Sequence, residues 1–155
     1  MVEEKITIAR SFKVSDYKYI VFHDDILPTA LCDGVEFNEE QAEAYINSNI
    51  FLSIHYGDYL IGFVAFDYIL PTLYRIHIGI LEPYRHKKTE YIVGKAILWL
   101  SVEKKSPQIL AQIRASLRNV ISLAYKCNFT ICGNIPKSVT HGGKTEDLIL
   151  MAWKQ

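Results

Sequence analysis

The spacing of apolar and polar residues divides the chain into alternating strand-like and helix-like segments. Alternation, or a short continuous apolar run, predicts a strand, whereas apolar residues three and four positions apart predict a helix. The predicted strands are Glu4–Arg10, Phe51–Tyr56, Tyr59–Tyr68, Tyr74–Leu81, Ile109–Ala115, Phe129–Ile135 and Asp147–Trp153. The predicted helices are Ser15–His23, Asn38–Asn47, Thr89–Lys104 and Arg118–Lys126. A polar loop is expected at Pro136–Glu146.

The middle of the chain predicts a sheet that is covered on both sides. Gly57-Asp58 separates two strand-like runs and is typical of a two-residue hairpin turn. The second of these runs, Tyr59 to Phe66, is apolar on both of its faces, so it belongs inside the sheet. We therefore expect an α/β (α+β) fold whose mixed, largely antiparallel central sheet is flanked by helices on both faces.

Capping and stop signals set the expected helix ends. Ser15 or Asp16 has the side chain of a cap for the first helix. Asn38 followed by Gln41 has the form of a capping box for the second. Pro107 ends the third helix, because proline cannot continue it.

Composition narrows the class of protein. With 155 residues, 50% of them hydrophobic, the chain suits one domain spanning residues 1–155 with a core of its own. Lys and Arg balance Asp and Glu at 17 each, so no excess charge recruits nucleic acid or an anionic membrane surface. No apolar run reaches the roughly 18 residues of a membrane span. The polar start, Met1–Lys5, is unlike a signal peptide, so a cytoplasmic protein is expected.

The cysteines predict neither a metal site nor a disulfide framework. Cys32, Cys127 and Cys132 are odd in number and do not have the spacing of metal ligands. We interpret them as reduced, buried thiols and expect no metal.

A basic turn between a strand and a helix is the strongest sign of a ligand. The strand Tyr74–Leu81 ends at Glu82-Pro83-Tyr84, and Arg85-His86-Lys87-Lys88 then leads into the helix that begins at Thr89. Unpaired N–H groups and the positive end of the helix dipole meet at such a junction and favour an anion. The pattern predicts a phosphate-bearing ligand; the alternative is a solvated basic entry to the helix.

A family resemblance lies in three segments of the chain, Leu81–Lys88, Val120–Phe129 and Asp147–Met151. Together they resemble the GNAT superfamily, the Gcn5-related N-acetyltransferases. Leu81–Lys88 looks like the coenzyme A pyrophosphate loop of that family, and Val120–Phe129 looks like its later helix, which ends in a Gly-Phe pair. Asp147–Met151 resembles the closing strand. A histidine before the loop, as His77 stands here, is also familiar from phage-encoded and related bacterial members, so a phage-encoded member is one origin to consider.

The resemblance implies acetyl-CoA as co-substrate and assigns residues to it. The backbone near Gly79, Ile80 and Leu81 would hold the pantetheine arm, and the turn would hold the phosphates. The residues implied for the phosphates are Arg85, His86, Lys87, Lys88 and Thr89. The sequence departs from the family at Lys88 and Glu90, where two glycines are usual, and at Leu117 and Ala124, where asparagine and tyrosine are frequent.

Three catalytic candidates follow if the chain is an acyltransferase. His77 shares a strand face with Arg75 and suits a general base, since imidazole titrates near neutral pH; the alternative is a hydrogen-bonded core histidine. Tyr125, one position beyond the family's tyrosine, is a candidate donor to the leaving thiolate, although a packing role is the alternative. Glu82 is a second candidate base.

The remaining polar residues that were considered are assigned neither a catalytic nor a phosphate-binding role. His55 and Asp67 lie on the hairpin and could reach a cleft, but the favoured interpretation is that they are ordinary surface polar residues. The glycine-containing stretch Thr140–Lys144 is interpreted as a mobile flap beside the acceptor site, because it lacks the strand-to-helix context of a P-loop.

The sequence thus favours a single-domain, acetyl-CoA-dependent N-acetyltransferase that acts on a primary amine of unknown identity. The alternative is a catalytically inactive binding or assembly module on the same fold, such as a bacteriophage accessory protein. The expected partners are coenzyme A and an amine-bearing acceptor, without nucleic acid or membrane. A homodimer is left open.

Overall fold

The computed structural model of the chain describes residues 5–29 and 34–155. In this part of the chain seven strands and four helices follow one another in the predicted order. The strands are β1 (Ile6–Arg10), β2 (Ile50–Tyr56), β3 (Tyr59–Leu70), β4 (Leu73–Ile80), β5 (Gln108–Arg114), β6 (Phe129–His141) and β7 (Lys144–Trp153). The helices are α1 (Val14–Val21), α2 (Glu39–Ser48), α3 (Thr89–Glu103) and α4 (Arg118–Lys126). Short 3₁₀ turns lie at Leu27–Thr29, Glu82–Tyr84 and His86–Lys88.

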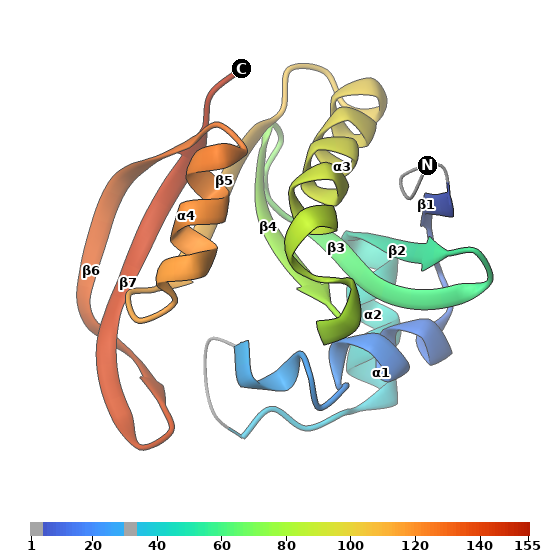
Figure 1. Cartoon of the computed structure of the whole chain (residues 1–155), viewed down its shortest axis with the longest axis horizontal. Coiled ribbons are helices and arrows are strands. Elements are labelled where there is room, and N and C mark those ends of the chain that lie inside the picture. The colour runs from blue at the N-terminus through green and yellow to red at the C-terminus, as the bar shows by residue number, and fades with distance from the viewer. Residues whose placement is uncertain (1–4, 30–33) are drawn as a thin grey trace.

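The described strands form one mixed sheet in the order β1-β2-β3-β4-β5-β7-β6. Every neighbouring pair is antiparallel except β4 and β5, which run parallel. Figure 1 shows β1 to β4 on one side of the molecule and β5 to β7 on the other, with α3 and α4 in front of the sheet. The predicted mixed, largely antiparallel sheet is confirmed.

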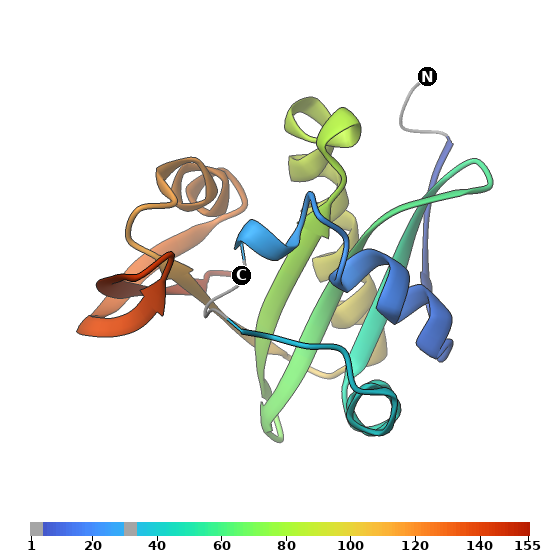
Figure 2. The same cartoon turned by 90° about the horizontal axis from the view of Figure 1, so that it is seen from below.

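Helices cover both faces of the sheet, as predicted, and each face has its own core. Figure 2 shows α3 and α4 on one side of the sheet and α1 and α2 on the other. The larger core lies on the α3 side and includes Phe66, Tyr74 and Leu100, each almost completely buried. The smaller core lies on the α1 side and includes Ile20 and Phe51. None of the helices in the described ranges is long and apolar enough to cross a membrane.

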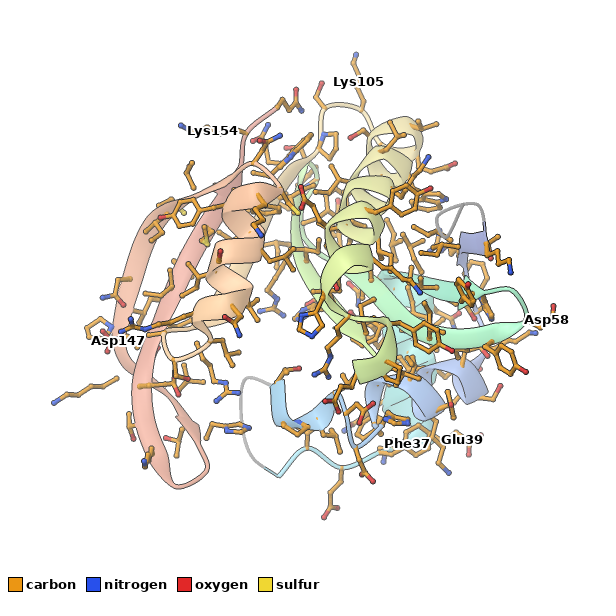
Figure 3. The ribbon with its side chains drawn as sticks, viewed as in Figure 1. Phe37, Glu39, Asp58, Lys105, Asp147 and Lys154 are labelled. Carbon is orange, nitrogen blue, oxygen red and sulfur yellow. The ribbon has the colours of Figure 1, made fainter. Side chains whose placement is uncertain are left out.

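The hairpin and the second helix form as their local signals predict. Gly57 takes a φ of +59° in the β2–β3 turn, a conformation that glycine reaches without strain. Figure 3 places its neighbour Asp58 at the far tip of this hairpin. The Asn38 side chain accepts a hydrogen bond from the N–H of Gln41 at 2.9 Å, which caps α2.

The predicted cap of the first helix is wrong. Helix α1 begins at Val14 and its N-cap is Lys13, so neither Ser15 nor Asp16 caps it. The Ser11 hydroxyl instead accepts from the N–H of Lys13 at 3.2 Å and donates to the Asp16 carboxylate at 2.8 Å. Because Ser11 fixes the chain before the helix, the first turn starts earlier than the cap signal suggests.

The predicted polar loop Pro136–Glu146 is also wrong, because these residues extend two strands into a long hairpin. Gly142 and Gly143, with φ of +58° and +73°, form the turn between β6 and β7. An irregularity between Ile135 and Val139 accommodates Pro136, which cannot donate to a strand ladder. The segment interpreted as a flap is therefore the tip of a paired hairpin.

A carboxylate stabilises the irregular part of β6. Asp147 on β7 accepts from the N–H of Lys137 at 3.0 Å and from the side-chain amide of Asn134 at 3.2 Å. The Lys137 hydrogen bond, supported by that of Asn134, holds the pKa of Asp147 below its ordinary value. The bulge is thus held by specific contacts.

The parallel pairing of β4 with β5 is short. Beyond Ile76 and Ala111 the two strands separate, and we call this separation the fork. The two strands pair only from Leu73 with Gln108 to Ile76 with Ala111. On its other side, β4 stays paired with β3 as far as Ile80 with Gly62. The last part of β4 therefore borders a gap in the sheet, and Figure 1 shows the two strands parting toward the basic turn.

Candidate active site at the strand fork

His77 is the first residue of β4 beyond the last pair with β5. It pairs with Ala65 of β3 on one side, while the β4–β5 ladder ends one residue earlier, at Ile76. Its side chain lies on the α1 side of the sheet together with that of Arg75, and the intervening Ile76 packs on the α3 side. The shared face of Arg75 and His77 is confirmed, and the register places the imidazole at the base of the fork.

Asp67 of β3 is the centre of a polar cluster around His77. Its Oδ2 lies 2.6 Å from Nε2 of His77 and accepts from Nε and Nη2 of Arg75 at 3.0 and 2.6 Å. Its Oδ1 accepts a hydrogen bond from the Tyr45 hydroxyl of α2. Only 7% of Asp67 is exposed, so these contacts replace water around a buried charge.

The cluster keeps the Asp67 carboxyl ionised. Burial by itself raises the pKa of Asp67, but the hydrogen bonds from His77, Tyr45 and Arg75 outweigh burial and lower it to about 2. Burial, together with the nearby Asp67 charge, raises the pKa of Tyr45 far above its ordinary value. At neutral pH the tyrosine is therefore a donor and the carboxylate an acceptor.

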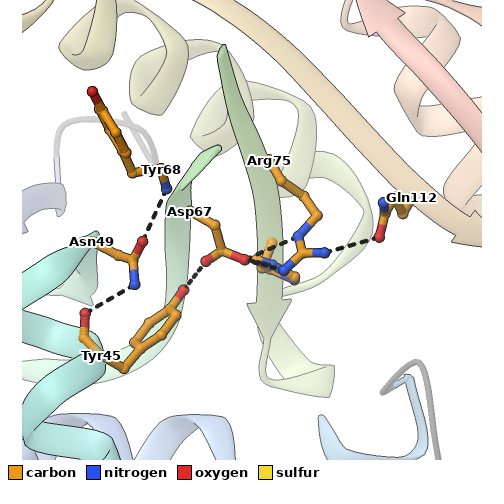
Figure 4. A network of polar contacts seen from close by, with 7 residues as sticks. Tyr45, Asn49, Asp67, Tyr68, Arg75 and Gln112 are labelled. Carbon is orange, nitrogen blue, oxygen red and sulfur yellow. Dashed lines mark hydrogen bonds and ion pairs between the residues drawn. The ribbon is translucent and has the colours of Figure 1, made fainter. Parts of the chain in front are cut away.

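The cluster connects α2 to β5 across the fork (Figure 4). Nη1 of Arg75 donates to the side-chain oxygen of Gln112 on β5 at 3.2 Å. At the other end, the Asn49 side chain donates to the carbonyl of Tyr45 at 3.2 Å and accepts from the N–H of Tyr68 at 2.9 Å. Helix α2 and strands β3, β4 and β5 thus hold the site together.

Beyond Ile76, alternate residues of β4 direct their backbone groups toward the fork and away from β3. The N–H of Leu81 donates to the carbonyl of Ile61 on the β3 side at 2.8 Å. Consecutive strand residues direct their N–H and C=O groups to opposite sides, so Gly79 also faces β3, whereas Ile78 and Ile80 face the fork. Of the three residues assigned to the pantetheine arm, only Ile80 presents its N–H to the gap.

Arg85 is used by the fold and does not project freely toward a ligand. Its Nε donates to the carbonyl of Ile80 at 2.8 Å, and its Nη2 donates to the carbonyl of Asp25. On the other side of the fork, Nη2 of Arg114 donates to the carbonyl of Pro28 at 2.7 Å. Two arginines, one beyond β4 and one on β5, therefore hold the Asp25–Pro28 segment across the open end of the fork.

The remaining residues of the basic turn have mixed environments. His86 is exposed and takes a φ of +68°, uncommon for a residue with a side chain. The Lys88 ammonium lies 4.4 Å from the ring centre of Tyr56 and 5.1 Å from that of Tyr84, which are cation–π distances. The side chain of Lys87 lies outside the part of the chain that the structure describes.

The two positions where the family has glycine do not require glycine here. Lys88 has a φ of −94° and belongs to ordinary helical conformations, and Glu90 lies in the first turn of α3. The left-handed conformation falls on His86 instead. The backbone can therefore make this turn with Lys88 and Glu90 in place, and Thr89 begins α3 directly behind it.

Tyr125 is not brought to the fork. Its side chain is 50% exposed and borders a hollow at the end of α4. The hollow is lined by Tyr125, Asn128, Phe129, Thr130, Lys154 and Gln155. Ala124, at the family's tyrosine position, is the residue that packs inward here. The one-residue offset in the sequence thus turns the tyrosine away from the core.

The surroundings of Glu82 and Cys127 are typical of residues with a structural role. Glu82 is exposed at the end of β4, and its N–H donates to the Asp25 carboxylate at 3.0 Å. Burial raises the pKa of the Cys127 thiol to about 11, which makes it a poor nucleophile. The prediction of buried thiols is confirmed for Cys127 and wrong for Cys132, which is exposed. Among the described residues no group of His, Cys, Asp and Glu could hold a metal ion, and Cys32 lies outside them.

Asp67 is the functional candidate that sequence reasoning missed. The sequence allowed Asp67 to reach a cleft but favoured a surface position, whereas the residue is buried at the centre of the cluster. The alternation of side chains along β3 could have identified Asp67 as an inward-facing residue. Phe63 and Ala65 precede it on the same face, and both are buried in the smaller core. A charge that continues a buried face needs partners, and Arg75 lies directly opposite on β4.

The fold has close counterparts among solved structures, although no family model and no curated protein matches the sequence. An acetyltransferase of the GNAT family from Streptococcus pneumoniae is 18% identical, with 95% of this chain and 98% of that chain covered and a TM-score of 0.75. Spermidine N-acetyltransferase from Vibrio cholerae, solved in complex with CoA and spermine, is 16% identical, with 96% and 95% covered and a TM-score of 0.81.

A third similar structure carries the same fold with a different acceptor in its name. Ribosomal-protein-S5-alanine acetyltransferase from Vibrio fischeri is 17% identical, with 97% of this chain and 96% of that chain covered and a TM-score of 0.76. Identities this low establish the shared fold and leave the chemistry of this chain to its own residues.

Proposed function

Because the chain has the fold of the GNAT acetyltransferases, we propose that it transfers an acetyl group from acetyl-CoA to a primary amine. The observation that carries the proposal is the position of His77, where β4 parts from β5, beside an ionised carboxylate. A base beside backbone N–H groups that are directed away from β3 has the parts needed for acyl transfer to an amine.

The fork suits the pantetheine arm and the thioester. The N–H groups of Ile78 and Ile80 face the gap and can donate to amide or thioester carbonyls. The basic turn and the N-terminus of α3 at Thr89 suit the phosphates. Lys88 would leave the rings of Tyr56 and Tyr84 to reach a phosphate, whereas Arg85 would serve by shaping the loop.

The reaction requires one proton acceptor close to the amine. The nitrogen lone pair forms a bond to the thioester carbon, and a backbone N–H in the fork stabilises the oxyanion. One proton passes from the nitrogen to His77, the carbon–sulfur bond breaks, and the departing thiolate takes a proton from water. His77 then returns its proton to the solvent, so that the products are an amide and CoA thiol.

Tyr125 receives no role in this proposal. Its half-exposed side chain borders the hollow at the end of α4, and Ala124 occupies the inward position. Water is the proton source for the thiolate instead.

Calorimetry and a thiol-release assay test the proposal. We expect micromolar binding of acetyl-CoA and CoA, and release of CoA thiol that is accelerated by at least one member of a panel of diamines, aminoglycosides and peptides. His77→Gln should reduce turnover at least tenfold while the Kd for acetyl-CoA stays within twofold of wild type. Absence of binding at millimolar acetyl-CoA would overturn the proposal. Tight binding without turnover on any amine would favour the inactive binding module.

A further inference from the structure

We infer that Asp67 is a positioning residue for this reaction, holding His77 with Nε2 protonated so that Nδ1 accepts the proton of the amine. The inference rests on the proposed function for its catalytic consequence. Its structural part, a fixed imidazole with one defined tautomer, can be tested on the protein without any substrate.

The chemistry of the contact decides which ring nitrogen carries the proton. An ionised carboxylate offers only acceptors, and Oδ2 of Asp67 lies 2.6 Å from Nε2 of His77. Nε2 must therefore be the donor, since two lone pairs at this distance would repel. In a neutral ring the remaining lone pair is then on Nδ1, which is the nitrogen able to act as base.

Nδ1 is the side of the ring that stays available. Among the described residues no hydrogen bond to Nδ1 of His77 is formed, and about a third of the side chain (33%) is exposed. The ionisable groups around the pair are Arg75 on the same strand, Tyr45 on α2 and Tyr17 on α1, and they act on Asp67. The neighbouring group from β5 is the neutral Gln112.

Asp67 can fix the orientation of the His77 imidazole because its own carboxylate is held in one orientation. Tyr45 binds one of its oxygens, and Arg75 binds the other through two nitrogens. Gln112 in turn fixes the Arg75 guanidinium from β5. With both oxygens held from different elements, Oδ2 keeps one direction, and the imidazole plane follows from it. A general base gains from such fixation because the orientation is set before the substrate arrives.

Proton NMR of the wild-type chain tests the contact directly. The Nε2–H of His77 should give a downfield resonance that exchanges slowly with water, and ¹⁵N coupling should show a protonated Nε2 and an unprotonated Nδ1. His77→Gln identifies the resonance by removing it. Asp67→Asn should remove it as well, because the charged acceptor is gone. Absence of this resonance in wild type, or a protonated Nδ1 in the neutral ring, would overturn the inference even if Asp67→Asn fails to fold.

A double-mutant comparison tests whether Asp67 acts through His77. Asp67→Asn should lower kcat at least tenfold with the KM for acetyl-CoA within twofold of wild type. The double variant Asp67→Asn with His77→Gln should be no slower than His77→Gln alone, because a positioning residue has nothing left to position. Additive losses in the double variant would show that Asp67 acts only through stability or by another route.

Asp16→Asn is the matched control. Asp16 accepts a hydrogen bond from Ser11 at 2.8 Å on α1, so the same chemical change removes a carboxylate contact outside the cluster. This variant should keep both the downfield resonance and the turnover of wild type. Loss of the resonance in Asp16→Asn would contradict the inference, since any local loosening would then produce the effect. If no amine is acetylated but the resonance behaves as described, the proposed function fails and the Asp67–His77 assignment stands.

Discussion

A buried carboxylate with four donors links the chemistry of the fork to acid stability. The hydrogen bonds from His77, Tyr45 and Arg75 lower the pKa of Asp67 to about 2, against an ordinary value of 3.8. A lowered folded-state pKa stabilises the fold above the unfolded pKa, and this contribution is lost as the pH falls through the folded pKa. The sensitive window is therefore pH 4 to 2.

Asp67→Asn should flatten this acid transition. Between pH 5 and pH 2 the free energy of unfolding of wild type should fall by about 2 kcal/mol more than that of the variant, because asparagine has no proton to take up. Urea unfolding at several pH values measures the difference. Asp58→Asn, at the exposed tip of the β2–β3 hairpin, is the control and should follow wild type. Parallel curves for wild type and Asp67→Asn would contradict the prediction.

Residue-level reasoning from the sequence succeeded for the two faces of β4 and failed for a polar residue that continues the buried face of β3. His77 and Arg75 were placed on one face of β4 because Ile76 and Ile78 define the other. The predicted strand Tyr59–Tyr68 includes Asp67, but a surface position was favoured for its carboxylate because most polar residues of a hairpin lie at the surface. Its partners come from α2 and β4, whose distance from it in space no sequence spacing reveals.

At the scale of elements, the hydrogen bonds of Arg85 connect the end of β4 to the segment after α1. Arg85→Ala should destabilise the fold by about 2 kcal/mol, because it removes charged donors from the carbonyls of Ile80 and Asp25. This differs from the sequence-based view of the turn as exposed charge. Lys105→Ala, in the exposed loop after α3 (Figure 3), should change stability by less than about 0.5 kcal/mol in the same denaturant titration. Equal stabilities of the two variants would contradict a stabilising role for the Arg85 hydrogen bonds.

Two glycines should respond to alanine in opposite directions. Gly94 lies within α3, and a Cβ added there meets nothing within 4 Å, so Gly94→Ala should stabilise the protein by up to about 1 kcal/mol. Gly143 has a φ of +73° in the β6–β7 turn, so Gly143→Ala should destabilise it by about 1 kcal/mol. Thermal unfolding of both variants measures the two signs. A stabilising effect at Gly143 would show that the turn does not hold this conformation in solution.

Helices and hairpins with local signals were predictable, and elements stabilised by distant contacts were not. Asn38 caps α2 as its spacing with Gln41 predicts. Pro136 suggested a loop, yet the β6–β7 hairpin continues because Asp147 binds the backbone of the bulge. The start of α1 shifted because Ser11 binds Lys13 ahead of the helix.

At the scale of the whole molecule, ligand binding should report on the fork. At a free ligand concentration of 100 times Kd, CoA should stabilise the fold by about 2.7 kcal/mol, since it binds only the folded state. Hydrogen exchange should slow at the N–H groups of Ile78 and Ile80, which face the gap. Leu81 is the internal control, because its N–H is already bonded to Ile61. Protection of Leu81 without Ile78 and Ile80 would place the ligand elsewhere.

The sheet order could be anticipated only through the family resemblance. Neighbouring strands in the meander β2-β3-β4 follow from short turns, whereas β5 inserts between β4 and β7. Nothing in the local pattern of Gln108–Arg114 specifies that position. The contacts that decide it, such as Arg75 with Gln112 and Arg114 with Pro28, join residues far apart in the chain.

The short ladder between β4 and β5 also has a mechanical consequence. Only four residue pairs join the two parts of the sheet there, and β1 and β7 lie on opposite sides of this seam. We expect a pull on the two ends of the chain to break this seam before the antiparallel ladders, because the seam has the fewest residue pairs. We expect the two parts of the sheet to separate there. A bound molecule that contacts both strands across the gap should raise the rupture force.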